Sequence, residues 1–293
     1  MPLSFFLYAL QAIRPRMAIE KSSYLNPLER GSLIHEVHYR FLSTLRQDGK
    51  LPLQAEQFSS IQSTLDAVLD SVQAEYQTRC LPVSDYLWKQ QISSFRVDLH
   101  FWLHSLFRQQ AWVPVFFELS FGLYPRAAQD EHSSASPVAL PSGLQLRGSI
   151  DLVEQNAEGA LRAVDYKTGK AQSKEGLIIG GGQILQPVLY ALALEQLFKD
   201  KKVEEGVLYY STFRGRFTQH AVKTTRLARD YAHLLSQSLD HALSEGFFVA
   251  APEKGACRFC DYQTLCGQDE EWRTNELRDK KALLTLQRLR QTP

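Results

Sequence analysis

The chain has 293 residues, of which 44% are hydrophobic and 22% are charged. This balance supports a buried core and excludes a disordered tail, and the length allows one large domain or two small ones. Lys and Arg (33) nearly equal Asp and Glu (32), which excludes a uniformly basic surface, so any phosphate-binding surface must be local.

No stretch is apolar over the roughly 18 residues that a membrane span requires. Residues 2–7 are partly apolar, but no basic segment precedes them and no cleavage site of a signal peptide follows them. We therefore expect a cytoplasmic protein with no membrane partner.

The first third of the chain is predicted to be helical. An apolar helix is expected over residues 3–13, ending near Pro15. The helical spacing of apolar residues predicts an amphipathic helix that begins at Gly31 and runs to residue 45. The same period predicts helices over residues 59–77 and 85–110.

The pattern becomes β-rich after Trp112. Strands are predicted at residues 113–121, 144–154, 161–167, 203–210 and 217–222, and helices at 183–198, 226–245 and 271–290. The polar segment 127–142 is predicted to be a loop or a hairpin tip.

This order of elements predicts an α/β fold: a mixed central sheet flanked by helices, with a helical N-terminal insertion and a C-terminal cysteine-rich segment. We interpret residues 1–293 as a single domain. Its expected parts are a mainly helical part (1–112), a core (113–246) and a cysteine cluster with a closing helix (247–293).

Three of the 4 cysteines, Cys257, Cys260 and Cys266, crowd near the C-terminus. In a reducing compartment this spacing favours metal or iron–sulfur ligation over a disulfide framework. The spacing alone does not distinguish Zn²⁺ from an iron–sulfur cluster, and Cys80 is expected to be an inert thiol.

The strongest chemical signal is the segment Gly148-Ser149-Ile150-Asp151 followed by Val164-Asp165-Tyr166-Lys167-Thr168-Gly169. A hairpin would bring Asp151 and Asp165 to one end of the sheet, and carboxylate oxygens suit Mg²⁺ or Mn²⁺. Lys167 would point the same way as Asp165 because strand residues alternate faces. Taken alone, this segment is better explained by a structural Asp–Lys ion pair next to an unrelated strand Asp.

Two helical fragments accompany it. His35 follows Gly31 by one helical turn, and Gln186 and Tyr190 share one face of a helix that follows a glycine-rich loop. Each fragment alone is more often a packed or surface feature.

Together, Gly31-x3-His35, Gly148-x2-Asp151, Asp165-Tyr166-Lys167-Thr168-Gly169 and Gln186-x3-Tyr190, in this order, resemble the RecB-like nucleases of the PD-(D/E)XK superfamily. The terminal cysteines and the strand containing Glu118 resemble the branch with an iron–sulfur cluster, which includes AddB-type helicase–nuclease subunits and CRISPR-associated RecB-like exonucleases. The resemblance runs from Pro2 to about Cys266 and implies a restriction-endonuclease-like nuclease core.

The resemblance implies a role for each matching residue. His35, Asp151 and Asp165, with the Tyr166 carbonyl, would bind Mg²⁺ or Mn²⁺, and Lys167 would orient the attacking water and stabilise charge on the phosphate. Gln186 and Tyr190 would support the site and touch the DNA backbone, and Glu118 would be an outer acid or water anchor.

The resemblance also implies a [4Fe–4S] cluster held by Cys257, Cys260, Cys266 and an N-terminal cysteine. Met1 stands where that fourth cysteine is expected. Either the chain is the C-terminal part of a longer protein whose start was placed over the cysteine, or the ligand has been lost. We favour the first explanation because the sequence context of residues 2–7 is kept.

Arg214 and Arg216 flank Gly215 beside aromatic residues, which suits a DNA-binding channel. The expected function is a Mg²⁺- or Mn²⁺-dependent deoxyribonuclease, most simply an exonuclease, that acts with an AddA-like motor subunit on DNA double-strand breaks. The alternatives are a catalytically silent DNA-binding or docking subunit, a stand-alone single-strand exonuclease, and a zinc-ribbon interaction module.

Overall fold

A computed structural model describes residues 25–80, 82, 84–124, 129–141, 143–171, 176–267, 269–277 and 283–293. The chain forms two compact units. The larger comprises the described residues up to Ile178 together with Ile184–Arg229, and the smaller comprises Ile179–Gln183 and the described part of Asp230–Pro293. The predicted boundaries after residues 112 and 246 divide the chain differently and stay a prediction. The helix expected over residues 3–13 lies outside the described residues.

Three long helices open the larger unit: α2 (Pro27–Gln47), α3 (Phe58–Cys80) and α4 (Asp85–Arg108), with a short 3₁₀ helix η2 (Ala55–Gln57) before α3. Helix α2 begins four residues before the predicted start at Gly31. The Asn26 side chain accepts from the backbone N–H of Leu28 and Glu29, and Glu29 accepts from the Asn26 N–H. This capping box, with Pro27 at the first helical position, fixes the earlier start.

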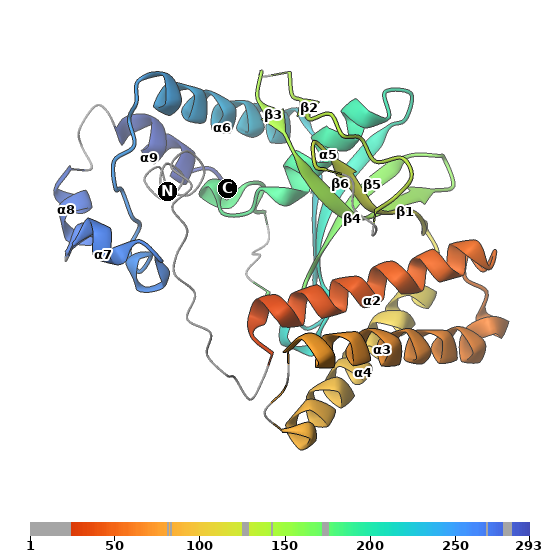
Figure 1. Cartoon of the computed structure of the whole chain (residues 1–293). Helices are drawn as coiled ribbons and strands as arrows, with labels where there is room; N and C mark the ends of the chain where they lie inside the picture. Colours follow the sequence, from red (N-terminus) through yellow and green to blue (C-terminus); the bar gives the residue numbers. More distant parts are fainter. Residues whose placement is uncertain are drawn as a thin grey trace. The chain divides into compact units, whose positions relative to one another are not determined.

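A five-stranded mixed sheet forms the centre of this unit and confirms the predicted α/β architecture. Its strand order is β1-β4-β5-β6-β7, with only β5 and β6 parallel, and α5 (Gln186–Leu197) connects those two strands. Figure 1 shows α2, α3 and α4 on one face of the sheet and α5 on the other. The strands are β1 (Trp112–Phe121), β4 (Gly148–Asn156), β5 (Leu161–Lys167), β6 (Val203–Tyr210) and β7 (Gln219–Lys223).

A small separate ladder joins β2 (Val138–Ala139), in the predicted polar loop, to β3 (Gln145–Leu146), which lies at the start of the strand predicted over residues 144–154. The remaining helices are η3 (Gly180–Gly182), η4 (Phe213–Gly215), α6 (Arg226–Ser244), η5 (Cys257–Phe259), α7 (Gln263–Cys266), α8 (Glu270–Leu277) and α9 (Leu284–Arg290). Helices α8 and α9 occupy the two ends of the single helix that was predicted over residues 271–290. Among the described helices, none combines the length and the apolar character needed to cross a bilayer.

Strand β1 changes its facing at Glu118. Phe117 packs in the core cluster with α2, α3 and α4, whereas Phe116 and Leu119 pack in the cluster with α5. Strict alternation would place Phe117 and Leu119 on the same face. The change coincides with a left-handed backbone at Glu118, where φ is 51°.

Strand β4 changes its facing at the same level. Leu152 packs with the three-helix layer and Ile150 packs with α5, so the alternation breaks at Asp151. The flanking pairs are Phe117 with Leu152 and Leu119 with Ile150, so Glu118 stands opposite Asp151. The two irregular positions therefore direct both carboxylates out of the regular sheet pattern.

Helix α5 lies directly on β6. A Cβ at Gly206 would stand only 1.8 Å from the carbonyl oxygen of Pro187, a distance that no side chain can occupy. Glycine at this position therefore permits the close seating of the helix on the sheet.

Candidate functional site

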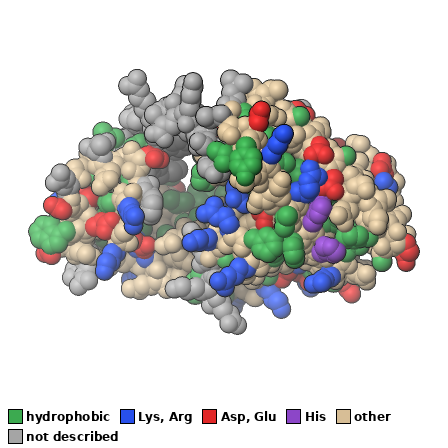
Figure 2. Space-filling model, turned by 90° about the horizontal axis from the view of Figure 1, so that it is seen from below, with side chains coloured by type: hydrophobic (Ala, Val, Ile, Leu, Met, Phe, Trp, Pro, Cys, Tyr) green, Lys and Arg blue, Asp and Glu red, His purple; other side chains and the backbone are tan. Residues whose placement is uncertain are grey.

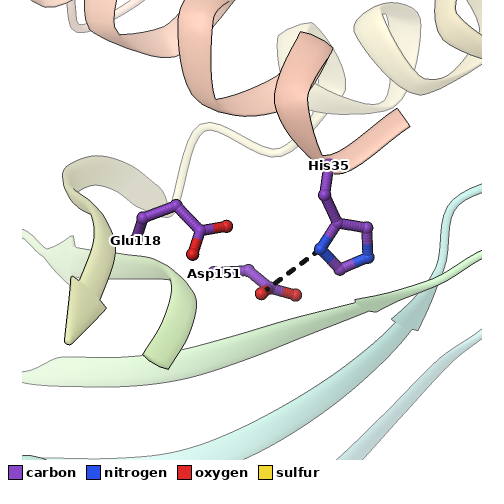
Figure 3. A group of neighbouring side chains, drawn as sticks. All are labelled: His35, Glu118 and Asp151. Atoms are coloured by element: carbon purple, nitrogen blue, oxygen red, sulfur yellow. Dashed lines mark ion pairs between the residues drawn. The ribbon is translucent and has the colours of Figure 1, made fainter. Parts of the chain in front are cut away.

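The described residues contain one group of three side chains that is suited to a metal ion: His35, Glu118 and Asp151, whose ligand atoms all lie within 4.8 Å of one another. His35 comes from α2, Glu118 from β1 and Asp151 from β4. Figure 3 shows the three side chains pointing toward one another, with His35 Nδ1 3.4 Å from Asp151 Oδ1. An imidazole and two carboxylates form a donor set that fits Mg²⁺ or Mn²⁺.

The second oxygen of Asp151 is held by the next strand. The Tyr166 backbone N–H donates a 2.7 Å hydrogen bond to Asp151 Oδ2. The β4–β5 ladder ends at the pair Leu152–Val164, so this bond joins the strands just beyond the last pair. It orients the carboxylate without using the oxygen that faces His35.

Asp165 stands beside this group of three and not within it. Its Oδ2 lies 2.5 Å from Lys167 Nζ, and its side chain is buried. Burial and the negative charge of Asp151 raise the pKa of Asp165, and Lys167 opposes that rise. The expected Asp–Lys pair is thus present, at the end of β5, next to Asp151.

The acids and the imidazole of the site perturb one another strongly. Burial and the charge of Asp151 raise the pKa of Glu118 to about 7. Burial disfavours the charged form of His35, but Asp151, Glu118 and Asp165 together raise its pKa to about 9. Three carboxylates confined in one place favour any added positive charge, whether a proton or a dication. This electrostatic demand agrees with the geometry in favouring a cation at these residues.

Tyr190 on α5 contacts the same region. Burial and the charges of Asp165, Asp151 and Glu118 raise its pKa well above the usual value for tyrosine. A Cβ at Gly148 would stand 3.4 Å from the Tyr190 ring, so glycine at the start of β4 leaves room for it. Gln186 is the first residue of α5, and within the described part of the chain its side chain makes no hydrogen bond to the site.

Two supporting residues were not singled out from the sequence. Ser149 donates a 2.8 Å hydrogen bond to Glu118 Oε2. His38 is buried, with its ring 4.0 Å from that of Trp102 and 4.3 Å from that of Tyr166. Burial and the charge of His35 lower the pKa of His38, which therefore stays neutral. His38 packs against the ring of Tyr166, the residue whose backbone N–H donates to Asp151. The sequence contained one indication of each role: Ser149 lies two residues before Asp151, and His38 lies one helical turn after His35.

The two arginines predicted to contact DNA lie on an exposed loop of the larger unit. Arg214 is in η4 and Arg216 follows it, and both side chains are exposed. The loop is attached to the end of β5 because Ser211 N–H donates to the Lys167 carbonyl at 3.0 Å.

The three clustered cysteines lie in the smaller unit. All four cysteines of the chain are free. Glu271 accepts hydrogen bonds from the backbone N–H groups of Gly255 and Cys257 and fixes the start of this loop. Burial and Glu271 raise the pKa of the Cys257 thiol. In the described residues, the cysteine sulfurs do not form a group as tight as that of His35, Glu118 and Asp151.

Comparison with known proteins gives one family. The family model described as PD-(D/E)XK nuclease superfamily matches residues 2–267, which is most of the chain. No curated protein matches. The match spans the sheet and all the residues of the site described above, so the α/β architecture is that of a PD-(D/E)XK nuclease.

Proposed function

The chain belongs to the PD-(D/E)XK nuclease superfamily, and we propose that it is a divalent-metal-dependent deoxyribonuclease that hydrolyses phosphodiester bonds. The observation that carries the proposal is the convergence of His35, Glu118 and Asp151 within 4.8 Å, with the Asp165–Lys167 pair beside them.

His35, Glu118 and Asp151 would hold Mg²⁺ or Mn²⁺, with Asp165 and the Tyr166 carbonyl as further oxygen donors. A bound dication lowers the pKa of its water and neutralises charge on the phosphate. Asp151 is already oriented for this role by its bond from Tyr166 N–H. His35 must release a proton before its nitrogen can act as a ligand.

Lys167 supplies the positive charge that the chain itself directs at the scissile phosphate. Its ammonium is held by Asp165 at 2.5 Å, so it is positioned before substrate arrives. A fixed cation of this kind stabilises the negative charge that grows on the phosphate in the transition state. Tyr190 and Gln186 would support the site from α5, and Arg214 and Arg216 would contact DNA.

We further propose that the chain is RecB-like and closest to the AddB-type nucleases, an exonuclease that works with a helicase–nuclease motor subunit on broken DNA. The order of its motifs and the spacing of Cys257, Cys260 and Cys266 support this. We propose that these cysteines hold an iron–sulfur cluster that stabilises the C-terminal segment. A residue other than these three cysteines would supply the fourth ligand.

A cleavage assay tests the proposed function. Single-stranded and duplex DNA, each end-labelled, is incubated with Mg²⁺ or Mn²⁺ and the wild type, Asp165→Ala or Lys167→Ala. The control is Asp200→Ala, an exposed acid in the turn before β6. We expect cleavage by the wild type and the control only. Equal cleavage by all four proteins would identify a contaminant, and an inactive wild type that still binds DNA would favour a docking subunit.

A further inference from the structure

Three phenylalanine rings form a cluster in the larger unit, in which two rings are exposed and the third, Phe217, is half-buried against the core. Phe101 of α4, Phe213 of η4 and Phe217 have ring centroids 4.7, 5.2 and 5.7 Å apart. Phe101 is 49% exposed and Phe213 is 53% exposed. Rings of this size at such exposure are costly on a surface that has nothing to cover them. We call these three residues the aromatic platform.

Positive charge lies beside the aromatic platform. Arg214 and Arg216 are exposed, and neither makes an ion pair with any residue that the structure describes. Arg30 of α2 is close enough to Arg214 that the two charges oppose each other. On the face shown in Figure 2, Lys and Arg side chains gather beside hydrophobic ones.

The loop that carries the platform is held in an unusual backbone shape. Arg216 and Phe217 both adopt the left-handed region, with φ of 57° and 52°. A Cβ at Gly215 would stand 2.4 Å from the Tyr210 Cβ, so this glycine lets the loop lie close against β6. Strain that is maintained at consecutive positions is typical of segments that present side chains to a ligand.

Asp98 of α4 holds the loop that carries Phe213. Its Oδ1 accepts a 2.8 Å hydrogen bond from the Phe213 N–H, and its Oδ2 accepts from Arg30 at 3.2 Å. The Asp98 side chain is buried, so its charge is directed at these two partners and does not reach the surface. One residue of α4 thereby joins α2 to the loop.

The platform is attached to the catalytic strand. The Ser211 N–H donates to the Lys167 carbonyl at 3.0 Å, and Thr212 Oγ1 donates to the Thr168 carbonyl at 3.2 Å. Phe213 is the next residue. A strand that lies on the platform therefore passes close to the end of β5, where Lys167 and Asp165 stand.

We propose that the aromatic platform stacks unpaired bases of a nucleic-acid strand, while Arg214 and Arg216 bind the neighbouring phosphates. The platform would thereby select single-stranded ends over duplex. This inference rests on the proposed nuclease function and specifies its substrate. Base faces are accessible to aromatic side chains only where the strand is unpaired, and such stacking tolerates any sequence. Two guanidinium groups at its edge, neither paired with an acid among the described residues, favour a polyanion over an apolar protein partner.

Binding by fluorescence anisotropy tests the proposal, with the full chain and Ca²⁺ in place of Mg²⁺ to prevent cleavage. The probes are a labelled single strand, the same strand in a duplex, and the single strand with abasic sites. We expect Phe101→Ala and Phe213→Ala each to weaken single-strand binding by about 10-fold, with duplex binding changed by less than about twofold. The abasic strand should bind the wild type as weakly as the intact strand binds Phe213→Ala.

Two controls separate stacking from misfolding. Phe213→Trp should keep single-strand binding because it keeps an aromatic face, and Tyr86→Ala, an exposed aromatic on the same helix as Phe101, should leave it unchanged. Arg214→Ala should weaken binding to both strand types and reduce the salt dependence by about one phosphate contact.

The outcomes distinguish the two proposals. Single-strand binding by Phe213→Ala equal to that of the wild type overturns the platform, even if the wild type cleaves DNA, and would leave a protein partner as its occupant. The expected binding pattern with no cleavage under Mg²⁺ or Mn²⁺ keeps the platform and removes the nuclease assignment.

Discussion

Ser149 on β4 donates a 2.8 Å hydrogen bond to Oε2 of Glu118 on β1. Burial and Asp151 raise the pKa of Glu118 to about 7, and the bond from Ser149 opposes that rise. Ser120 donates in turn to Ser149 at 3.1 Å, so the serine hydroxyl is fixed toward the acid. This small polar chain favours the charged form of Glu118, the form available to a cation, against the larger opposing effects of burial and Asp151.

Ser149→Ala should therefore weaken Mn²⁺ binding near pH 7. Loss of a hydrogen bond to a charged group costs about 1.5–3 kcal/mol, so we expect a loss of roughly 10-fold in affinity or more. Isothermal titration calorimetry of the wild type and the variant measures it. The difference between the two proteins should shrink as pH rises, because Glu118 then ionises in both. Ser93→Ala, an exposed serine on α4, is the control, and a variant that binds Mn²⁺ like the wild type would show that the bond is unimportant.

Metal affinity should rise with pH across the neutral range. Glu118 with a pKa of about 7 and His35 with a pKa of about 9 both hold protons that must leave when a cation binds. We expect the apparent affinity for Mn²⁺ to increase from pH 5.5 to 9, with release of protons on binding. Calorimetry in buffers of different ionisation enthalpy counts these protons. An affinity independent of pH would contradict the electrostatics of the site.

The metal-free protein should become less stable as pH rises. The Glu118 pKa is raised from 4.5 to about 7, so its contribution is complete below pH 4.5 and is lost as pH rises through 7. The His35 pKa is raised from 6.5 to about 9, so its contribution is complete below pH 6.5 and is lost through pH 9. Thermal unfolding in EDTA should show a falling Tm from these groups. Saturating Mn²⁺ should reverse the fall, and Asp151→Asn should abolish that rescue.

Lys167→Ala should reduce cleavage by at least about 10²–10³-fold, the usual loss for one preorganised electrostatic donor. DNA binding in Ca²⁺ should change little because the lysine acts on charge that develops in the transition state. Single-turnover cleavage and anisotropy measure the two effects separately. Lys202→Ala, an exposed lysine paired with Glu204, is the control. Equal losses in binding and cleavage would reduce Lys167 to a binding residue.

Gly206→Ala should destabilise the larger unit severely, because its Cβ would meet the Pro187 carbonyl oxygen at 1.8 Å. Helix α5 must then move away from β6, and overpacking of this kind costs typically 1–3 kcal/mol or more. Thermal unfolding by circular dichroism measures the change. Gly169→Ala, where a Cβ would meet no atom within 4 Å, should have a small effect.

Much of the fold could be predicted because helical spacing of apolar residues marks the long helices, and short apolar runs mark the buried central strands. Strand β6 (Val203–Tyr210) coincides with its predicted range, and β5 (Leu161–Lys167) does as well. The element boundaries that were predicted wrongly depend on local hydrogen bonding or on strained backbone. Helix α2 starts early because of the Asn26 cap, and β7 starts at Gln219, two residues late, because Arg216 and Phe217 are left-handed.

The candidate site was predictable in its parts and less so in its arrangement. The sequence predicted that Asp151, Asp165 and His35 converge, with Glu118 outside them. In the structure the tight group contains Glu118, and Asp165 pairs with Lys167. The left-handed backbone at Glu118 brings this acid toward His35 and Asp151. A positive φ at a glutamate cannot be predicted from the residue type or from the spacing of the motifs.

Strands β1 and β4 both break their alternation where Glu118 stands opposite Asp151. The alignment of the two strands therefore decides whether the proposed metal site can form. These strands are distant in sequence, and a slip of one residue between them would send the two acids to opposite sides of the sheet. A misaligned chain would then lack a complete cage for the ion. Binding of a dication would therefore stabilise only the correctly aligned sheet, so the proposed metal ligands would also favour the native strand register.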